Sequence, residues 1–426
     1  AQAVCRPKKT LKETPRHGRH SCPGRGMAPC LCGPRPTAVL PRVLAAAVCL
    51  ARRGLAASVS SGSGSLAFEA FVARHGRGYT RGSEEYASRR ALFEARLAEV
   101  DAHNARPDRT WEAEVQGFAD WTEGERARVR GYRRGGARRE DGGAVGAALL
   151  EQGLARSLDL PPKVDWRNLS MAKPAPNQGA CGSCWAVATV SALEAHREIH
   201  AKRRGKLSVQ ELVSCVQNPR HCGGKGGCDG ATVELGMQYV VKNGLNDASS
   251  VPYHAKDLPC KPQDLAELQG RDRPSGLTSL GLTSFTALPS NQLEPLMRSL
   301  AEGGPVAVSA AANNWFEYRS GVFDSCERDA VVDHAITMYG YGSDKKVGRK
   351  YWLIRNSWGP EWGEDGFMRI LRRDNEQAYC GVDREPAKGT GCDGGPASVP
   401  VCGTCGILYD SVVPHFGTKH ARGGAA

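Results

Sequence analysis

Cys184 is the residue of this chain whose surroundings best suit nucleophilic chemistry. It opens an apolar run over residues 185–194 that predicts a buried helix. A cysteine at a helix N-terminus faces the positive end of the backbone dipole, which lowers the pKa of the thiol and favours thiolate. Gln178 lies six residues upstream with glycines between, so the chain can fold back and bring an amide donor near the sulfur. A thiolate with a hydrogen-bond donor for a developing oxyanion is the minimum for acyl transfer. The alternative is that Cys184 is a structural cysteine with no catalytic role.

Such a nucleophile needs a base and a group that orients the base. His334 lies in the apolar, strand-like run 331–336, and Asn356 lies near the end of a second strand-like run, 351–359. They follow Cys184 by 150 and 172 residues. A lone histidine in an apolar run is more often a satisfied core residue. Because three separate stretches supply Cys, His and Asn in this order, we expect them to act together in catalysis.

The stretch 177–185, Asn-Gln-Gly-Ala-Cys-Gly-Ser-Cys-Trp, closely resembles the active-site signature of papain and the cathepsins. The resemblance to papain-like cysteine proteases of the cathepsin L-like type runs from about residue 66 to 385. It implies an α+β, papain-like fold of two subdomains, a helical half that carries Cys184 and a β-barrel-like half that carries His334 and Asn356, with the active-site cleft between them. It also implies a cysteine-type endopeptidase, a hydrolase, made as an inactive zymogen.

The family's catalytic roles carry over to four residues. Cys184 and His334 would form a thiolate–imidazolium pair, and peptide hydrolysis would pass through a thioester. The backbone N–H of Cys184 and the side chain of Gln178 would hold the oxyanion, and Asn356 would orient the imidazole. The resemblance places substrate-binding positions at Gly182, Gly230, Ala231, Thr232, Val233, Ser309, Val332, Asp333, Ala335, Trp358 and Glu385, with Trp358 also shielding the His–Asn hydrogen bond.

Glu385 is the informative member of this set. A carboxylate at the floor of the pocket for the second residue before the cut would let that pocket accept Arg or Lys. Val233 and Val332 predict that it also tolerates Leu or Phe. A solvated surface glutamate is the alternative reading of Glu385.

The sixteen cysteines fall into two groups, five within residues 1–49 and eleven from 181 to 405. Secreted chains favour paired thiols, so an odd number in the second group leaves one free, which the catalytic interpretation names as Cys184. The pair Cys402 and Cys405 could be half a zinc site, but no second pair at zinc spacing follows, so we expect no metal and no cofactor. The resemblance implies the disulfides Cys181–Cys228, Cys215–Cys260 and Cys326–Cys380, and leaves the pairing of Cys222, Cys392, Cys402 and Cys405 open.

Upstream of the catalytic residues lies a predicted helix with one patterned face. This face resembles the helix of the cathepsin prodomain, except that Arg96 stands where Asn is usual. Residues 116–120 resemble the second prodomain motif, except that Gln116 stands where Asn is usual. The resemblance implies a segment that runs backwards through the substrate cleft and blocks it. A small helical domain with no inhibitory role is the alternative. The residues on the patterned face are Glu85, Arg89, Phe93, Val100 and Asn104.

The formal net charge of +12 does not indicate nucleic-acid binding. Residues 1–66 carry eleven Lys or Arg and one Glu, so most of the positive charge belongs to this tail. The apolar run 43–51 fits the core of a signal peptide and is too short to span a bilayer. We therefore expect translation to start at Met27, with cleavage near residues 56–58; an ordinary N-terminal extension is the alternative.

These observations divide the chain into five segments. The C-terminal segment is expected to add a strand or to cover the β-rich half, and Asn168 begins a glycosylation acceptor triplet. The segments are an N-terminal extension with the signal peptide (1–65), a helical inhibitory prodomain (66–121), a linker and activation segment (122–157), the papain-like catalytic domain (158–390) and a cysteine-containing C-terminal extension (391–426).

We therefore expect a monomeric endopeptidase of the secretory pathway, in the lysosome or an acidic vacuole or outside the cell. Its partners would be protein and peptide substrates and its own prodomain, with no nucleic acid and no stable membrane insertion. A catalytically silent papain-like binding protein is the main alternative, but that class usually lacks Cys, His or Asn, and all three are present. A stand-alone inhibitor would not need the complete catalytic half, and the motifs do not resemble transglutaminase-like acyl transferases.

Overall fold

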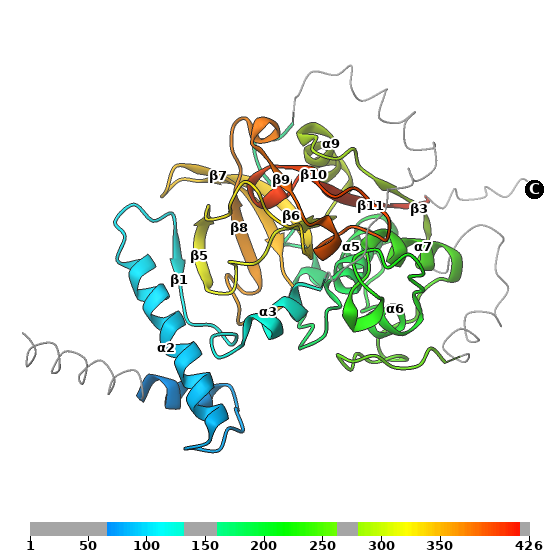
Figure 1. Cartoon of the computed structure of the whole chain (residues 1–426). Coiled ribbons are helices and arrows are strands. Elements are labelled where there is room, and N and C mark those ends of the chain that lie inside the picture. The colour runs from blue at the N-terminus through cyan, green and yellow to red at the C-terminus, as the bar shows by residue number, and fades with distance from the viewer. Residues whose placement is uncertain (1–65, 132–159, 262–279, 418–426) are drawn as a thin grey trace, which may run out of the picture. The chain divides into compact units, whose positions relative to one another are not determined.

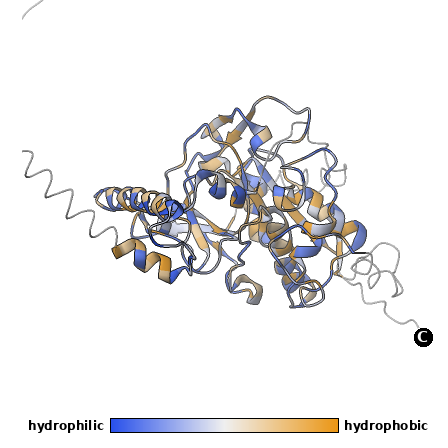
Figure 2. Cartoon of the chain, turned by 60° about the horizontal axis from the view of Figure 1, so that its bottom comes forward, coloured by the Kyte–Doolittle hydropathy of each residue, from blue (hydrophilic) through white to orange (hydrophobic). Residues whose placement is uncertain are grey.

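The computed structural model describes residues 66–131, 160–261 and 280–417. The chain from Gly62 onward forms one compact unit, which contains all of them. The predictions for Met27, the signal peptide, its cleavage region and the activation segment from residue 132 lie outside the described residues. The described helices mix hydrophobic and hydrophilic residues (Figure 2), and none of them is long and apolar enough to cross a membrane.

The helix α2 (Glu84–Asn104) is the main element of the prodomain (Figure 1). Its N-cap is Ser83, whose hydroxyl accepts a hydrogen bond from the backbone N–H of Tyr86. The predicted apolar face is buried, because Phe93 packs on Phe68 and Phe71 with ring centroids 5.4 and 4.9 Å apart. The patterned face therefore docks α2 on the short helix formed by residues 66–74.

Polar residues of the two prodomain motifs fix the path of the chain after α2. Asp120 accepts two hydrogen bonds from Arg77, with Nε to Oδ2 at 2.8 Å. Arg89 binds Glu125 at 2.7 Å, and this hydrogen bond lowers the pKa of Glu125 to about 2. Asn104 makes two hydrogen bonds with the backbone of Ala113, the last residue of β1 (Trp111–Ala113). These contacts hold β1 in position to join the catalytic sheet.

Residues 122–131 form a helix, although the sequence predicted the start of a linker there. The helix α3 (Glu123–Arg130) begins with a capping box, in which Thr122 and Glu125 each accept a hydrogen bond from the other's backbone N–H. It ends at Gly131, whose φ of 85° is left-handed. The prediction was wrong because it weighed the arginine-rich composition downstream and missed the capping box. This helix delivers the chain to the active site.

The helical half is built around α5 (Cys184–Ala201). Every residue from Cys184 to Glu198 is buried, which explains the alanine-rich run with few charges: no side of the helix faces water. It packs against α7 and against strands of the sheet. The other elements of this half are η1 (Ser170–Ala172), α6 (Val209–Cys215), η2 (Gly227–Asp229) and α7 (Val233–Asn243).

The predicted β-rich half is present as a nine-stranded sheet beside these helices (Figure 1). Its order is β1-β5-β8-β7-β6-β4-β11-β3, with β2 also paired to β6, and β5–β8 is its parallel pair. The strands are β2 (Val164–Asp165), β3 (Leu282–Ala287), β4 (Val306–Ala310), β5 (Tyr318–Phe323), β6 (His334–Asp344), β7 (Arg349–Arg355), β8 (Phe367–Leu371) and β11 (Asp410–Phe416).

The described strands do not close into a barrel, contrary to the barrel-like half that was expected. The edges of the sheet are β1, which belongs to the prodomain, and β3. One hydrophobic core lies in the β-rich half around Trp315, Trp352 and Trp362, and a second surrounds α5 and includes Trp185. Two short helical segments, α9 (Leu293–Arg298) and the π-helical η3 (Ser299–Gly303), precede β4.

The C-terminal segment is part of the sheet and not an appendage. Strand β11 lies between β4 and β3, so it is an interior strand. Before it, β9 (Cys380–Asp383) and β10 (Val399–Cys402) form a two-stranded sheet in which Cys402 lies opposite Cys380. The short turns of this region are η4 (Glu376–Ala378), η5 (Pro386–Lys388) and η6 (Thr404–Gly406).

The predicted disulfide Cys326–Cys380 is wrong. Cys326 binds Cys405, and Cys380 binds Cys402, its neighbour across β9 and β10. Cys380 and Cys405 are each followed by a glycine, and it is Cys405, just before β11, that binds Cys326. The two other predicted pairs are present, Cys222 pairs with Cys392, and Cys184 is the one free cysteine of the described residues.

Candidate active site

Cys184 is the first residue of α5, as the sequence predicted, and it is fully buried. Its Sγ lies 3.2 Å from the carbonyl oxygen of Arg130, to which the thiol donates, and 3.4 Å from the backbone N–H of Ala335. Arg130 is the last residue of α3, and residues 66–131, which extend the predicted prodomain by this helix, are called the prodomain from here on. The thiol is therefore engaged as a hydrogen-bond donor by a backbone carbonyl oxygen.

Burial controls the protonation of both reactive groups. It raises the pKa of the Cys184 thiol to about 12, although N–H groups of Ala335 and Trp185 oppose the rise. It also lowers the pKa of His334 to about 4, partly offset by the hydrogen bond with Asn356. Near neutral pH the covered site therefore holds a thiol and a neutral imidazole. The loss of water outweighs the helix dipole that was expected to favour thiolate.

His334 and Asn356 meet as predicted. The ring Nε2 lies 2.8 Å from Oδ1 of Asn356, and that oxygen also accepts a hydrogen bond from the backbone N–H of Ser357 at 2.7 Å. The other ring nitrogen, Nδ1, lies 3.2 Å from the Arg130 carbonyl oxygen. The ring of Trp358 covers the imidazole at a centroid distance of 5.0 Å. The histidine is thereby held with Nδ1 on the side of the catalytic sulfur.

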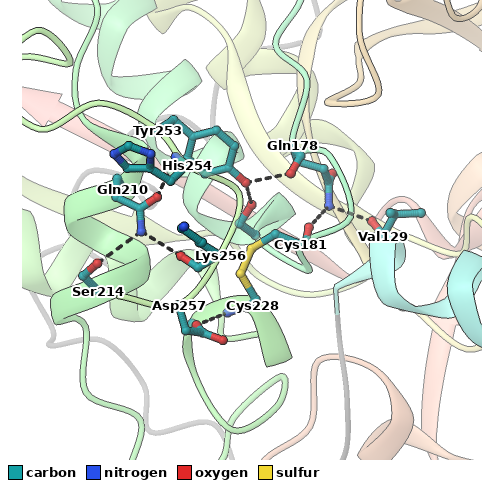
Figure 3. The surroundings of a disulfide bond; sticks show 12 residues. Val129, Gln178, Cys181, Gln210, Ser214, Cys228, Tyr253, His254, Lys256 and Asp257 are labelled. Carbon is teal, nitrogen blue, oxygen red and sulfur yellow. Dashed lines mark hydrogen bonds between the residues drawn. A yellow bond between two sulfur atoms is a disulfide. The ribbon is translucent and has the colours of Figure 1, made fainter. Parts of the chain in front are cut away.

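The side-chain nitrogen of Gln178 points toward Val129 and Cys181 (Figure 3). Its Nε2 donates to the carbonyl oxygens of Val129 at 2.9 Å and Cys181 at 2.8 Å. Its Oε1 accepts from the Ser357 hydroxyl at 2.5 Å, which fixes the orientation of the amide. Tyr253 donates to the Gln178 backbone carbonyl at 2.8 Å. The predicted oxyanion donor is therefore oriented by its neighbours and occupied by a prodomain carbonyl.

Glycines allow the prodomain backbone to touch both walls of the site. A Cβ on Gly131 would lie 2.3 Å from Cys184 Sγ, and a Cβ on Gly230 would lie 1.8 Å from the Gly131 carbonyl oxygen. A Cβ on Gly182 would lie 2.9 Å from the carbonyl oxygen of Arg128. Side chains at these three positions would collide with the opposite backbone or the sulfur, so glycine is required for this close approach. Ala231, Thr232 and Val233 follow Gly230 and are buried.

Three strands carry one row of candidate pocket residues beside His334. Ala335 on β6 is paired with Ser309 on β4, and Ser309 is paired with Asp410 on β11. The Ser309 hydroxyl donates to Oδ2 of Asp410 at 2.7 Å. Residues paired across neighbouring strands point to the same face of a sheet. Asp410 therefore joins two predicted pocket residues, and the sequence reading had missed it.

Glu385 does not take this place. Its side chain is exposed and pairs with Lys388 at 2.5 Å, at the start of η5. Val332, which is buried, donates its backbone N–H to Asp383 and not to Glu385. The alternative reading of Glu385, a solvated surface glutamate, agrees with this exposure. The carboxylate beside Ser309 is Asp410.

Glu385 instead lines a cavity of about 1150 Å³ that Arg130 and Asp333 also line. There the Arg130 guanidinium binds Asp333, with Nε to Oδ2 at 2.6 Å, while Oδ1 accepts from the backbone N–H of Ala312 at 3.1 Å. Burial raises the pKa of Asp333, and the charge of Arg130 opposes this shift. The prodomain thus binds the substrate position Asp333 through a side chain.

The described residues include no group of three or more His, Cys, Asp or Glu side chains arranged to hold a metal ion. Cys402 and Cys405, considered for zinc, each belong to a different disulfide. Their sulfur atoms are bonded to other sulfurs and are not thiolate ligands.

The geometry defines a cysteine-nucleophile hydrolase site covered by the chain's own N-terminal segment. Residues 160–390 match the papain family cysteine protease, and residues 68–125 match the cathepsin propeptide inhibitor domain (I29). The chain belongs to the papain family of cysteine proteases and carries its inhibitory propeptide.

The sequence similarity to known relatives extends over both the propeptide and the protease segment. The chain is 32% identical over 320 residues to procathepsin L of Mus musculus, covering 72% of this chain and 86% of that protein. It is 31% identical over 318 residues to the senescence-specific cysteine protease SAG12 of Arabidopsis thaliana, covering 73% and 86%. Against cysteine protease 1 of Oryza sativa subsp. japonica it is 35% identical over 329 residues, covering 74% of this chain but 62% of the relative's length.

Solved structures agree with the fold. The procathepsin L2 proteinase from Tenebrio molitor larval midgut superposes with a TM-score of 0.62 at 27% identity, covering 83% of this chain and 100% of that one. Procathepsin L 3 from the same tissue also gives 0.62, at 26% identity, covering 83% and 99%. Both are procathepsins, in keeping with the covered site of this chain.

Proposed function

We propose that this chain is the zymogen of a cysteine endopeptidase that hydrolyses peptide bonds through a thioester, with Cys184 as nucleophile and His334 as general acid and base. One observation carries the proposal. Two consecutive prodomain carbonyls occupy the reactive groups, Val129 on Gln178 and Arg130 on both Cys184 and His334. A site that binds peptide carbonyls at its nucleophile, base and amide donor suits peptide hydrolysis.

The direction of the prodomain accounts for its resistance to cleavage. It passes from Arg130, on the Asp333 side, to Gly131, on the Gly230 side. In the family the residues before the cut pair with the loop that holds Gly230. The prodomain therefore runs opposite to a substrate.

Removal of the prodomain opens the reaction. Water then reaches Cys184 and His334. Burial no longer raises the pKa of the Cys184 thiol or lowers the pKa of the His334 imidazole. The thiolate then attacks the scissile carbonyl, and the backbone N–H of Cys184 with the Gln178 amide holds the oxyanion. His334 protonates the leaving amine and later takes a proton from water, and Asn356 keeps the ring aligned.

Asp410 gives the enzyme a basic preference at the second residue before the cut. It lies in one row with Ser309 and Ala335, next to the catalytic histidine. In Asp410→Asn we expect the ratio of cleavage rates for Arg over Leu at that position to fall roughly tenfold, which corresponds to one charge-assisted hydrogen bond. Glu385→Gln is the matched control and should keep the wild-type ratio. An unchanged ratio in Asp410→Asn would remove Asp410 from the pocket.

The enzyme belongs to the secretory route, in an acidic vacuole or lysosome or outside the cell. Five disulfides among the described cysteines support an oxidising route of synthesis. The substrates are proteins and peptides, and the working form is a monomer.

The first experiment follows the mass of the purified chain and its cleavage of fluorogenic peptides at acidic pH. The expected result is loss of the prodomain together with thiol-dependent cleavage, and Cys184→Ala should show neither. A folded, processed protein that cleaves no peptide would contradict the proposal and favour the silent binding protein.

A further inference from the structure

Asn168-Leu169-Ser170 is the only Asn-x-Ser/Thr triplet in the 426 residues of the sequence. In a secreted chain such a triplet, with any residue except proline in the middle, is an acceptor for an N-linked glycan. The catalytic function makes no use of it. Because triplets of this kind also occur by chance, the question is whether the folded chain has room for a glycan at Asn168.

Asn168 lies at the tip of a surface turn between β2 and η1. The backbone N–H of Leu169 donates to the carbonyl oxygen of Trp166 at 3.1 Å, so Arg167 and Asn168 are the two central residues of the turn. Asn168 and Ser170 are both exposed. A bulky, hydrated glycan on the Nδ2 nitrogen of Asn168 therefore extends into solvent and displaces no packed side chain.

The strand next to the turn sets its distance from the catalytic histidine. In the pairing of β2 with β6, Asp165 lies opposite Gly340. Gly340 is six residues along β6 from His334, which is about 20 Å at the rise of a β-strand. The turn follows β2 directly, so it lies well away from the imidazole.

The helix below the turn gives a second, independent distance, this time from the nucleophile. Glu198 accepts hydrogen bonds from the backbone N–H groups of Ser170 and Met171, both at 3.1 Å. Glu198 is fourteen residues along α5 from Cys184, which is about 21 Å at the rise of an α-helix. The turn therefore rests near the C-terminal end of α5, whereas the active site is at its N-terminal end.

The place of the triplet in the chain also favours modification. Asn168 precedes all the cysteines that form the described disulfides, of which Cys181 is the first. The growing chain therefore presents the triplet before any of these crosslinks can close. Asn168 also follows the prodomain, so removal of residues 66–131 leaves this residue on the enzyme.

We propose that Asn168 carries an N-linked glycan that stays on the processed enzyme and leaves its active-site cleft open. The inference rests on the secretory route of the proposed function. The co-reactant is an oligosaccharide joined through pyrophosphate to a lipid of the secretory membrane. A bond forms between Nδ2 and C1 of the first sugar, the bond from C1 to the pyrophosphate oxygen breaks, and the lipid pyrophosphate leaves with the amide proton transferred to base.

The test is made on the full chain secreted by a eukaryotic host. Peptides of the secreted protein are mapped by mass before and after treatment with peptide N-glycosidase, which leaves an aspartate where a glycosylated asparagine stood. The peptide that contains Asn168 should carry a glycan in the untreated sample and an aspartate at this position in the treated one. The same glycan should be present after the prodomain has been removed.

Matched variants separate the triplet from the asparagine itself. Ser170→Ala should abolish the glycan, whereas Ser170→Thr should keep it, because the triplet needs a hydroxyl at its third position. Asn375→Gln changes an exposed asparagine outside any triplet and should keep the glycan. Processed Asn168→Gln should cleave fluorogenic peptides with a kcat/KM within about twofold of the wild type, because the turn is remote from the site.

Each outcome decides between the inference and the proposed function. Secreted protein with an unmodified Asn168 overturns the inference, whether or not the protein is active. Recovery of the folded chain only from the cytosol overturns it together with the secretory route. A change of about tenfold in kcat/KM in Asn168→Gln would show that the glycan reaches the cleft. Glycosylated, processed protein that cleaves no peptide instead overturns the proposed function and leaves the glycan assigned.

Discussion

Arg130 contacts the catalytic centre with two different groups. Its backbone carbonyl lies against Cys184 and His334, and its guanidinium binds Asp333 at 2.6 Å. The first contact covers both reactive groups, and the second anchors the helix α3. Neither role was visible in the sequence, because Arg130 lies in a stretch rich in arginines and no pattern distinguishes it from its neighbours.

The buried thiol predicts low reactivity in the zymogen. Burial raises the pKa of Cys184 to about 12, so almost no thiolate exists at pH 7. Alkylation of Cys184 by iodoacetamide, followed by peptide mass mapping, should be at least 100-fold slower in the zymogen than in the processed enzyme. Equal rates in the two forms would show that the prodomain does not control the thiol.

The pair between Arg130 and Asp333 predicts a measurable share of inhibition. In Arg130→Ala the buried Asp333 loses its cation, which should weaken prodomain binding by about 1–3 kcal/mol. Processing at acidic pH should then be about tenfold faster than in the wild type. Arg128→Ala is the control, because Arg128 lies on the same helix with an exposed side chain. If both variants process at the wild-type rate, the pair contributes nothing to inhibition.

At the scale of elements, α5 carries a buried histidine that makes stability depend on pH. His196 donates its Nε2–H to the Pro305 carbonyl oxygen, 2.8 Å away, and burial lowers its pKa to about 3. His415 lies nearby with a pKa also lowered by burial, and His200 is the third histidine of the cluster. Between pH 6.5 and 3, His196 is protonated in the unfolded chain and neutral in the folded one. Its contribution to stability is therefore fully present above pH 6.5 and is lost as the pH falls through this window.

The expected loss from His196 is about 2 kcal/mol at pH 5 relative to pH 7. His196→Leu should therefore show a smaller drop in Tm between pH 7.5 and pH 5 than the wild type, whatever its absolute Tm. His254→Leu, at an exposed position, should keep the wild-type drop. If His196→Leu shows the same drop in Tm between pH 7.5 and pH 5 as the wild type, the pH dependence comes from other groups.

The elements that position the triad could be predicted from the sequence, and those of the C-terminal segment could not. The run after Cys184 and the runs around His334 and Asn356 have strong local patterns, so α5, β6 and β7 were found. The segment after Cys380 offers two Cys-Gly motifs, and local pattern gives no way to choose between Cys380-Gly381 and Cys405-Gly406. The choice depends on which one places the following strand beside β4, which is a tertiary contact.

At the scale of the whole molecule, this choice decides where the catalytic domain ends. The match to the papain family stops at residue 390, yet β11 lies between β4 and β3. Residues after 390 also supply the partners of three cysteines, Cys222, Cys326 and Cys380. The domain predicted to end at residue 390 therefore lacks an interior strand and three of its five described disulfides.

Truncation after residue 390 should abolish folding. It would expose the edge of β4, separate β3 from the sheet and leave three unpaired thiols, at a cost larger than the 5–15 kcal/mol that stabilises a typical domain. Refolded protein should show no cooperative thermal transition by circular dichroism, whereas truncation after Gly417 should keep the wild-type Tm within about 2 °C. A cooperative transition near the wild-type Tm in the shorter protein would mean that the papain-like half folds without β11, and that the C-terminal segment is an appendage after all.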